Sequence, residues 1–317
     1  MRKKLLALLF FAIVSGIRIS NAQMVNYKIL KDDPADVTNF WLYLDPFNFD
    51  IGAKNIDGTT FNIGLSSFAN IGKNLGGEFR FQYGIITLGR LGNDKDKLNP
   101  HIKVEAGGFY TVTVRNKRVN TKVVLSATSR SSGSYTVTTT RSIMVPATKH
   151  LALGVRGGLY TLGGVFGTSD IETTVALPKV INYRMAGVYL GLLSASTRNV
   201  IINTDTDGKA LRSTRTRIYA DVLITPITYA GLDGTSYKSD LNPDIFGFRI
   251  GMQTLPVEVR KIKDLNVKTK GVSYGVEIGV RPIDGFYMAC NASICLMRKK
   301  LSILGYKAPA SSYNTSE

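Results

Sequence analysis

The chain has very few of the residues from which most enzyme active sites are built. Its 317 residues include only two histidines and two cysteines. A nucleophilic hydrolase needs a base beside its serine or cysteine, and neither His101 nor His150 stands in a recognisable Ser/His/acid motif. A structural zinc site needs a complete tetrahedral ligand set, which two distant histidines and two separated cysteines do not supply. We therefore predict no catalytic residue, no metal site and no cofactor.

The scarcity of cysteine also bears on stability. Cys290 and Cys295 lie in a segment that reads as one strand, so their side chains point to opposite faces, about 16 Å apart at the rise of a strand. A disulfide needs α-carbons within about 7 Å of each other. We predict that both thiols stay free unless a turn separates them.

Long apolar runs are missing except near the N-terminus. Residues 5–17 are apolar, but a membrane-spanning helix needs roughly 20 such residues. Basic residues precede this run and small residues follow it, the three-part pattern of a secretory signal peptide. We predict that residues 1–22 are removed by cleavage between Ala22 and Gln23, the alternative being a permanent N-terminal anchor. The same scarcity excludes an exported α-helical membrane protein.

Acidic residues are also scarce. The chain has 40 Lys and Arg against 23 Asp and Glu, and without the predicted signal peptide 36 basic residues remain, a net charge of +13. Such an excess attracts nucleic acid, anionic lipid or anionic solutes. Nucleic acid is the least accessible of these to an exported chain. We expect outer-membrane lipid and lipopolysaccharide as partners and no nucleic acid, or else a basic surface that only maintains solubility.

Strict alternation of apolar and polar residues is abundant, and it is typical of a strand whose two faces meet different surroundings. Segment 272–281 shows it most clearly, with valine, tyrosine and isoleucine opposed to serine, glycine and charged residues. Glycine recurs on the polar face, where a soluble β-sandwich would favour lysine and glutamate. Because glycine weakens a strand, its repetition indicates crowding or sharp curvature, as inside a barrel.

These patterns predict an all-β fold, a closed antiparallel transmembrane β-barrel. An open sheet edge in hydrocarbon would leave backbone groups unpaired at a cost of several kcal/mol each. Bacterial single-chain barrels have even strand numbers, so we predict about twelve strands, within a range of ten to fourteen. Candidate strands begin near residues 37, 47, 59, 76, 101, 119, 134, 148, 171, 185, 215, 245, 271 and 286. Aromatic residues near segment ends are predicted to form interfacial girdles: Phe40, Trp41, Phe68, Tyr110, Tyr160, Tyr189, Phe246 and Phe286.

The resulting organisation is a periplasmic N-terminal segment at 23–36, a barrel at 37–306 and a flexible tail at 307–317. Connections of alternating length would place the longer set outside the cell. The short connections are predicted at 57–58, 116–118 and 282–285, and the long ones at 91–100, 162–184, 196–214, 226–244 and 255–270. Two of the long ones are basic, which is compatible with contact to lipopolysaccharide phosphates or with ordinary solvated loops. Their basic residues are Arg198, Lys209, Arg212 and Arg215, and Arg260, Lys261, Lys263, Lys268 and Lys270.

The same alternation places a set of charged side chains in the barrel lumen. A basic bias there would favour the passage of anions. Pairing across a narrow interior would instead leave no pore, and we favour this filled interior. The predicted lumen-facing residues are Glu78, Arg80, Glu105, Arg156, Asp221, Arg249, Glu277 and Arg281.

The chain resembles the uncharacterised outer-membrane β-barrel proteins of Bacteroidota-type bacteria. The resemblance rests on 21–23 at the cleavage site, on Phe248–Gly251, on Arg217–Leu223, and on Gly275–Arg281 with the hairpin that follows it. It implies residence in the cell outer membrane, but its motifs are generic to the architecture. Such barrels commonly end in an aromatic residue, whereas this chain ends in Glu317.

Several functions are compatible with these features. The first is a barrel without catalytic activity, either a scaffold or accessory barrel with protein partners in an envelope complex, or a small-solute pore. The second is a passive, anion-preferring, porin-like channel. The third is a soluble periplasmic β-protein.

Overall fold

The computed structural model describes residues 25–35, 37–52, 56–72, 74–91, 97–133, 135–168, 177–241, 244–256, 271–283 and 285–299. The predicted signal peptide, its cleavage site at Ala22 and Gln23, and the predicted tail at 307–317 lie outside these ranges. The elements are β1 (Tyr27–Asp32), β2 (Phe40–Gly52), η1 (Ile56–Gly58), β3 (Thr60–Asn70), β4 (Leu75–Thr87), η2 (Leu88–Arg90), β5 (Ile102–Ser132), β6 (Tyr135–Gly167), β7 (Val180–Thr204), β8 (Gly208–Leu232), β9 (Thr235–Ser236), α2 (Lys238–Leu241), β10 (Phe246–Pro256), β11 (Val272–Arg281) and β12 (Gly285–Lys299). Among these residues, no helix is long and apolar enough to cross a membrane.

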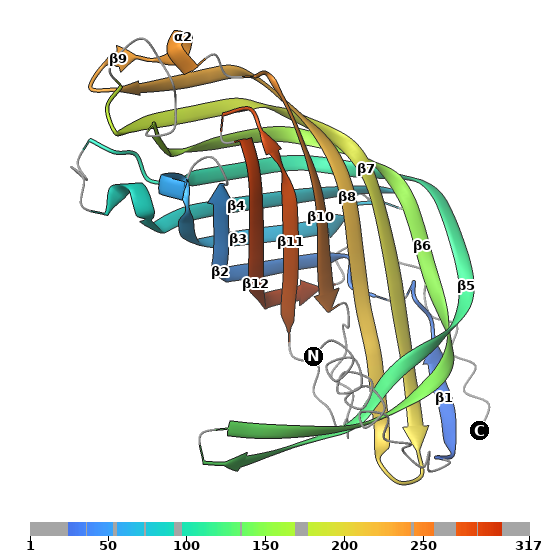
Figure 1. The fold of residues 1–317 in the computed structure, drawn as a ribbon. Helices are drawn as coiled ribbons and strands as arrows, with labels where there is room; N and C mark the ends of the chain where they lie inside the picture. Colours follow the sequence, from blue (N-terminus) through green and yellow to red (C-terminus); the bar gives the residue numbers. More distant parts are fainter. Residues whose placement is uncertain are drawn as a thin grey trace, which may run out of the picture.

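The twelve strands form one antiparallel sheet, and ten of them close into a barrel (Figure 1). The ring runs β2, β3, β4, β5, β6, β7, β8, β10, β11 and β12, and the pairing of β12 with β2 closes it. Two strands lie outside the ring, since β1 pairs with β7 and β9 pairs with β8. The predicted fold class is confirmed.

Several predicted strands turn out to be parts of one longer strand. The segments near 37 and 47 are both in β2, where the register shifts between Asp45 and Asn48. Those near 101 and 119 are both in β5, which shifts between Thr111 and Thr113. A bulge adds one residue and so reverses the alternation, which makes one strand read as two. The segments near 134 and 148 are likewise one strand, β6.

The outer surface of the barrel is apolar around the whole ring. Each of the ten strands exposes large hydrophobic side chains, and exposure alternates residue by residue with burial, as in β10 and β11. Examples are Phe49 on β2, Leu190 on β7 and Phe248 on β10, whose side chains are 44%, 58% and 53% exposed. The side chains between them point into the barrel.

Strands β5 to β8 continue past one end of the barrel (Figure 1). We call this region the extension; it comprises β1, residues 116–150 of β5 and β6, and residues 198–213 of β7 and β8. Strand β6 pairs with β7 only as far as Lys149 opposite Arg198. Beyond that point β1 lies beside β7, with Asp32 opposite Val200 and Tyr27 opposite Thr204.

The extension has an apolar core of its own. This core contains Val123, Leu125, Val145, Ala147, Val200, Ile202 and Ala210, with Val25, Ile29 and Ile143 packed against it. Asp32 ties β1 to β6, because its carboxylate accepts hydrogen bonds from the Thr148 amide and hydroxyl at 2.8 Å each. Arg118 Nη1 lies 2.8 Å from the same carboxylate.

The predicted alternation of short and long connections is wrong. The short turns at 57–58 and 282–285 lie at the same end of the barrel as the connections between β4 and β5, β6 and β7, and β8 and β10. Residues 116–118 are in the middle of β5, and 196–214 form a hairpin whose strands are interrupted only at 205–207. Most of the predicted loop at 255–270 lies outside the described residues. Phe40 and Lys299 pair at the other end, where the extension begins.

Candidate functional site

The eight charged side chains predicted to face the lumen all lie inside the barrel. They come from β4, β5, β6, β8, β10 and β11, at the inward positions of the alternation. These side chains are between 0% and 7% exposed, except that of Arg80, which is 16% exposed. Charges this deeply buried persist only when they are paired and hydrogen-bonded.

Arg249 is the centre of this network. Its Nε lies 2.7 Å from Asp221 Oδ2 and its Nη1 lies 2.6 Å from Glu105 Oε1. The same Nη1 is 3.4 Å from Glu277 Oε2. One guanidinium from β10 therefore joins carboxylates from β5, β8 and β11 across the lumen.

Glu277 is the second centre. Its carboxylate receives Lys103 Nζ at 3.0 Å and Arg80 Nη1 at 3.6 Å. The hydroxyls of Tyr219 and Tyr287 donate hydrogen bonds to it at 2.6 and 2.8 Å. With this many donors, the carboxylate is fully satisfied by protein groups.

Two further groups complete the network. Glu78 pairs with Arg156 and Arg217, each at 2.6 Å, and accepts a hydrogen bond from the Tyr189 hydroxyl at 2.8 Å. Arg156 connects this group to the centre through Asp221, at 3.6 Å.

Arg281 forms a bidentate pair with Asp50, and its guanidinium stacks on the ring of Tyr287, 3.5 Å from the centroid. The network as a whole contains six cations and five carboxylates: Arg80, Lys103, Arg156, Arg217, Arg249 and Arg281, with Asp50, Glu78, Glu105, Asp221 and Glu277. Asp45, buried and hydrogen-bonded to the Ser66 hydroxyl, adds a sixth interior carboxylate.

Three members of the network were not among the predicted residues: Lys103, Arg217 and Asp50. The sequence held the signal for each of them. Lys103 is two residues before Glu105 and Arg217 is four before Asp221, so both share the inward face of their strands. Asp50 belongs to the polar face of its own alternating segment.

Aromatic rings fill the space between the charges, and here the predicted girdles need correction. Trp41, Phe68, Tyr160 and Tyr189 are buried inside the barrel instead of lying at its outer rim. The guanidinium of Arg217 lies 4.5 Å from the Phe68 ring centroid, and that of Arg249 lies 5.0 Å from that of Tyr189. Tyr110, Phe246 and Phe286 are exposed on the outer surface.

Two glycines make room for aromatic rings. A Cβ at Gly251 would lie 2.3 Å from the Tyr219 ring, and one at Gly76 would lie 2.1 Å from that of Phe109. Any larger residue would displace a ring from the interior.

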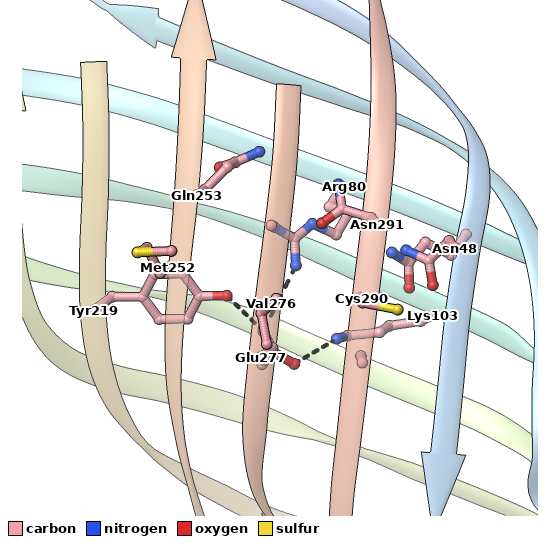
Figure 2. A pocket seen from close by; sticks show the side chains of 13 residues that line it. Asn48, Arg80, Lys103, Tyr219, Met252, Gln253, Val276, Glu277, Cys290 and Asn291 are labelled. Carbon is pink, nitrogen blue, oxygen red and sulfur yellow. Dashed lines mark hydrogen bonds and ion pairs between the residues drawn. The ribbon is translucent and has the colours of Figure 1, made fainter. Parts of the chain in front are cut away.

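Little empty space remains at the level of the network. Figure 2 shows Tyr219, Arg80 and Lys103 converging on Glu277 around a cavity of about 10 Å³. A second cavity of about 10 Å³ lies between Glu78, Phe68 and Arg156. Each is the size of about one water molecule.

A larger cavity of about 320 Å³ lies at the extension end of the barrel and is lined by residues including Arg215, His150 and Phe109. Side chains therefore fill the lumen at the level of the network, and the lumen widens towards the extension.

The two histidines lie in different surroundings. His150 Nδ1 lies 2.9 Å from Asn116 Oδ1 in the extension, and His101 is buried beside Gly84 and Gly164. No group of three or more His, Cys, Asp or Glu side chains in the described ranges is arranged to hold a metal ion. Cys290 and Cys295 are both in β12, and both are free.

No protein-family model matches the chain, and no curated protein matches it. Among solved structures it is similar to OmpT, an outer membrane protein of Vibrio cholerae. A mutant of that protein lacking loop L8 is 8% identical, with 85% of this chain and 99% of that chain covered and a TM-score of 0.17. The form expressed in the outer membrane is also 8% identical, with 84% and 100% covered and a TM-score of 0.16. Similarity at this level does not assign a function to the chain.

Proposed function

We propose that this chain is an integral outer-membrane β-barrel with a closed lumen and no catalytic activity, which serves as a scaffold or accessory barrel of an envelope complex. This proposal rests on the network of ion pairs inside the barrel. In a water-filled pore the lining charges would be accessible to water, whereas the paired side chains at Arg249 and Glu277 are 0% and 5% exposed.

The apolar outer surface supports the membrane assignment. Soluble monomers rarely expose contiguous apolar patches of more than a few hundred Å², whereas here every barrel strand contributes exposed hydrophobic side chains. A closed barrel also leaves no unpaired strand edge, which hydrocarbon requires. These features disfavour the soluble periplasmic protein. The strand motifs also support a kinship with Bacteroidota-type barrels.

The anion-preferring channel is the main competing function. The network offers six cations for anions to meet, but each already has a carboxylate partner. Arg215, which lines the wider part of the lumen, donates a hydrogen bond to Asn70 instead. An anion passing this level would have to break ion pairs in a region of low dielectric. We therefore infer a barrel that does not conduct.

The extension supports the scaffold role. Its hairpin tip, residues 126–141, is a two-stranded ribbon whose described side chains are mostly exposed. An isolated two-stranded hairpin is marginally stable in water, so a partner that covers it would stabilise it.

The first experiment measures insertion and conductance on the same preparation. The purified protein, reconstituted in lipid, should migrate faster on gel electrophoresis before boiling than after, and should give no current steps in planar bilayers. A known porin in the same bilayers is the positive control. Discrete current steps from protein that shows the heat-dependent shift would overturn the closed lumen, and loss of the shift would overturn the barrel in a membrane.

The second experiment addresses the partner. The chain should migrate in a larger complex in mild detergent extracts, and deletion of residues 126–141 should release it while the heat-dependent shift persists. Recovery of the intact barrel alone, without partners, would contradict the scaffold role.

A further inference from the structure

A row of four cationic residues crosses the outer face of the sheet at the base of the extension. It consists of Lys117 on β5, Lys149 on β6, Arg198 on β7 and Arg212 on β8, and we call it the basic row. Lys117 is directly opposite Lys149, and Lys149 is directly opposite Arg198. Directly opposite residues have Cβ atoms about 4.5–5.5 Å apart, and like charges placed so destabilise a sheet.

The register puts all four on the face that is apolar in the barrel. Three residues of β7, Leu190, Leu192 and Arg198, all have even numbers and no bulge lies between them, so their side chains are on the same face. Lys149 shares that face with Leu153. Arg212 is opposite Val200, the next outward residue of β7 after Arg198. The opposite, inward face here carries His150 and Arg215, which line the large cavity.

Carboxylates are absent from this neighbourhood of the sequence. Residues 106–168 contain no Asp or Glu but eight Lys and Arg. No described carboxylate forms an ion pair with any member of the basic row, whereas the neighbouring Arg118, on the other face, pairs with Asp32. The Nε atoms of Arg198 and Arg212 are buried and have no hydrogen-bond acceptor among the described groups.

The basic row lies at a boundary on this face of the sheet. Towards the barrel, the same face carries Ser194 and Ser196 and then exposed leucines; away from it, Val200 and Ile202 are covered by the core of the extension. The row therefore marks the boundary between the exposed apolar surface and the part that protein covers. In a membrane, this boundary is the level of the lipid headgroups.

From this geometry we infer that the basic row binds the phosphate of an anionic membrane lipid headgroup. The inference rests on the proposed insertion of the barrel into a membrane. A phosphate offers several strong acceptor oxygens, so one headgroup can bridge Lys149 and Arg198 and relieve their repulsion. Each basic residue near a membrane surface contributes to such binding.

The test compares a row variant with a charge-matched control in the full-length protein in detergent. The row variant is Lys149→Gln with Arg198→Gln. The control is Lys122→Gln with Lys209→Gln, which removes the same charge from the other face of the extension. The dissociation constants of phosphatidylglycerol and phosphatidylcholine are measured by native mass spectrometry. The variant Lys149→Arg with Arg198→Lys keeps the charges and should bind like the wild type.

The wild type and the control should prefer phosphatidylglycerol, and the row variant should bind it roughly 30-fold more weakly. Equal losses in the row variant and the control, or no preference in the wild type, would overturn the proposal. Inorganic phosphate that binds as tightly as the lipid would assign the row to a soluble anion and overturn the lipid assignment.

The heat-dependent shift of each variant, recorded in parallel, separates this outcome from failure of the proposed function. A wild-type protein that shifts on boiling but has no lipid preference overturns the site alone. A protein that does not shift overturns the barrel in a membrane and this proposal with it.

Discussion

The barrel and the extension share strands β5 to β8, but they differ in what covers the outer face of these strands. In the barrel this face exposes leucines, whereas in the extension its valine and isoleucine side chains lie in a buried core. On one face of β7, Leu190 and Leu192 are 58% and 67% exposed, whereas Val200 and Ile202 are fully buried. On this face of β7, protein covers the apolar side chains only beyond the barrel. This difference is the one expected if the barrel surface faces hydrocarbon and the base of the extension lies outside it.

Removing the central cation should have the largest effect. Arg249→Leu leaves Glu105, Asp221 and Glu277 facing one another without their shared guanidinium, and we expect a loss of about 3–5 kcal/mol in the free energy of unfolding. Urea unfolding in detergent, followed by fluorescence of the only tryptophan, Trp41, measures it. Arg118→Gln, which removes the exposed partner of the Arg118–Asp32 ion pair in the extension, should cost less than about 1 kcal/mol. Equal effects of the two variants would show that the interior is not the low-dielectric region described here.

A charge on the outer face should have the next largest effect. Leu190→Arg places a cation on the barrel surface, and in a bilayer it should destabilise the folded state by about 2–4 kcal/mol if the residue lies near the midplane. Thr138→Arg, on the exposed hairpin of the extension, is the control and should change stability by less than about 0.5 kcal/mol. Tolerance of arginine at both positions would remove the distinction between the two surfaces.

A smaller effect is expected from trimming the core of the extension. Ile202→Val removes one methylene from a fully buried site and should cost about 0.5–1.5 kcal/mol, detected as faster amide hydrogen exchange in β1. Leu192→Val, on the outer surface of the barrel, leaves no cavity in protein and should not change this exchange. Faster exchange in the second variant would mean that the two regions are not independent.

The sequence predicts the barrel well because the alternation of apolar and polar residues shows directly that the two faces of each strand have different surroundings. It predicts strand boundaries less well because a bulge shifts the alternation by one residue without any change in composition. Thr111–Thr113 is such a place, and β5 therefore reads as two strands. The same local pattern could not predict that Leu192 is exposed while Val200 is buried in the core of the extension, because this depends on packing against segments far away in the chain.

Contacts inside the barrel are also difficult to predict from the sequence. The alternation of residues along a strand predicts which side chains point inward, and all eight predicted charged residues do so. It does not predict which of them form ion pairs, because Arg249 contacts carboxylates from three other strands. Trp41 and Tyr189 were expected at the rim because aromatic residues near strand ends are typical of girdles. They lie inside, where the guanidinium groups of Arg215 and Arg156 stack on their rings.

Spin-label accessibility measures directly whether the outer face of the barrel lies in hydrocarbon. A nitroxide is attached at Leu192→Cys on the barrel or at Asn203→Cys on the extension, each in a protein with Cys290→Ser and Cys295→Ser, and both are reconstituted in lipid vesicles. The label at 192 should relax faster with oxygen, which concentrates in hydrocarbon, and the label at 203 should relax faster with a water-soluble nickel complex. Faster relaxation by nickel at 192 would place the outer face of the barrel in water and rule out its insertion into a membrane.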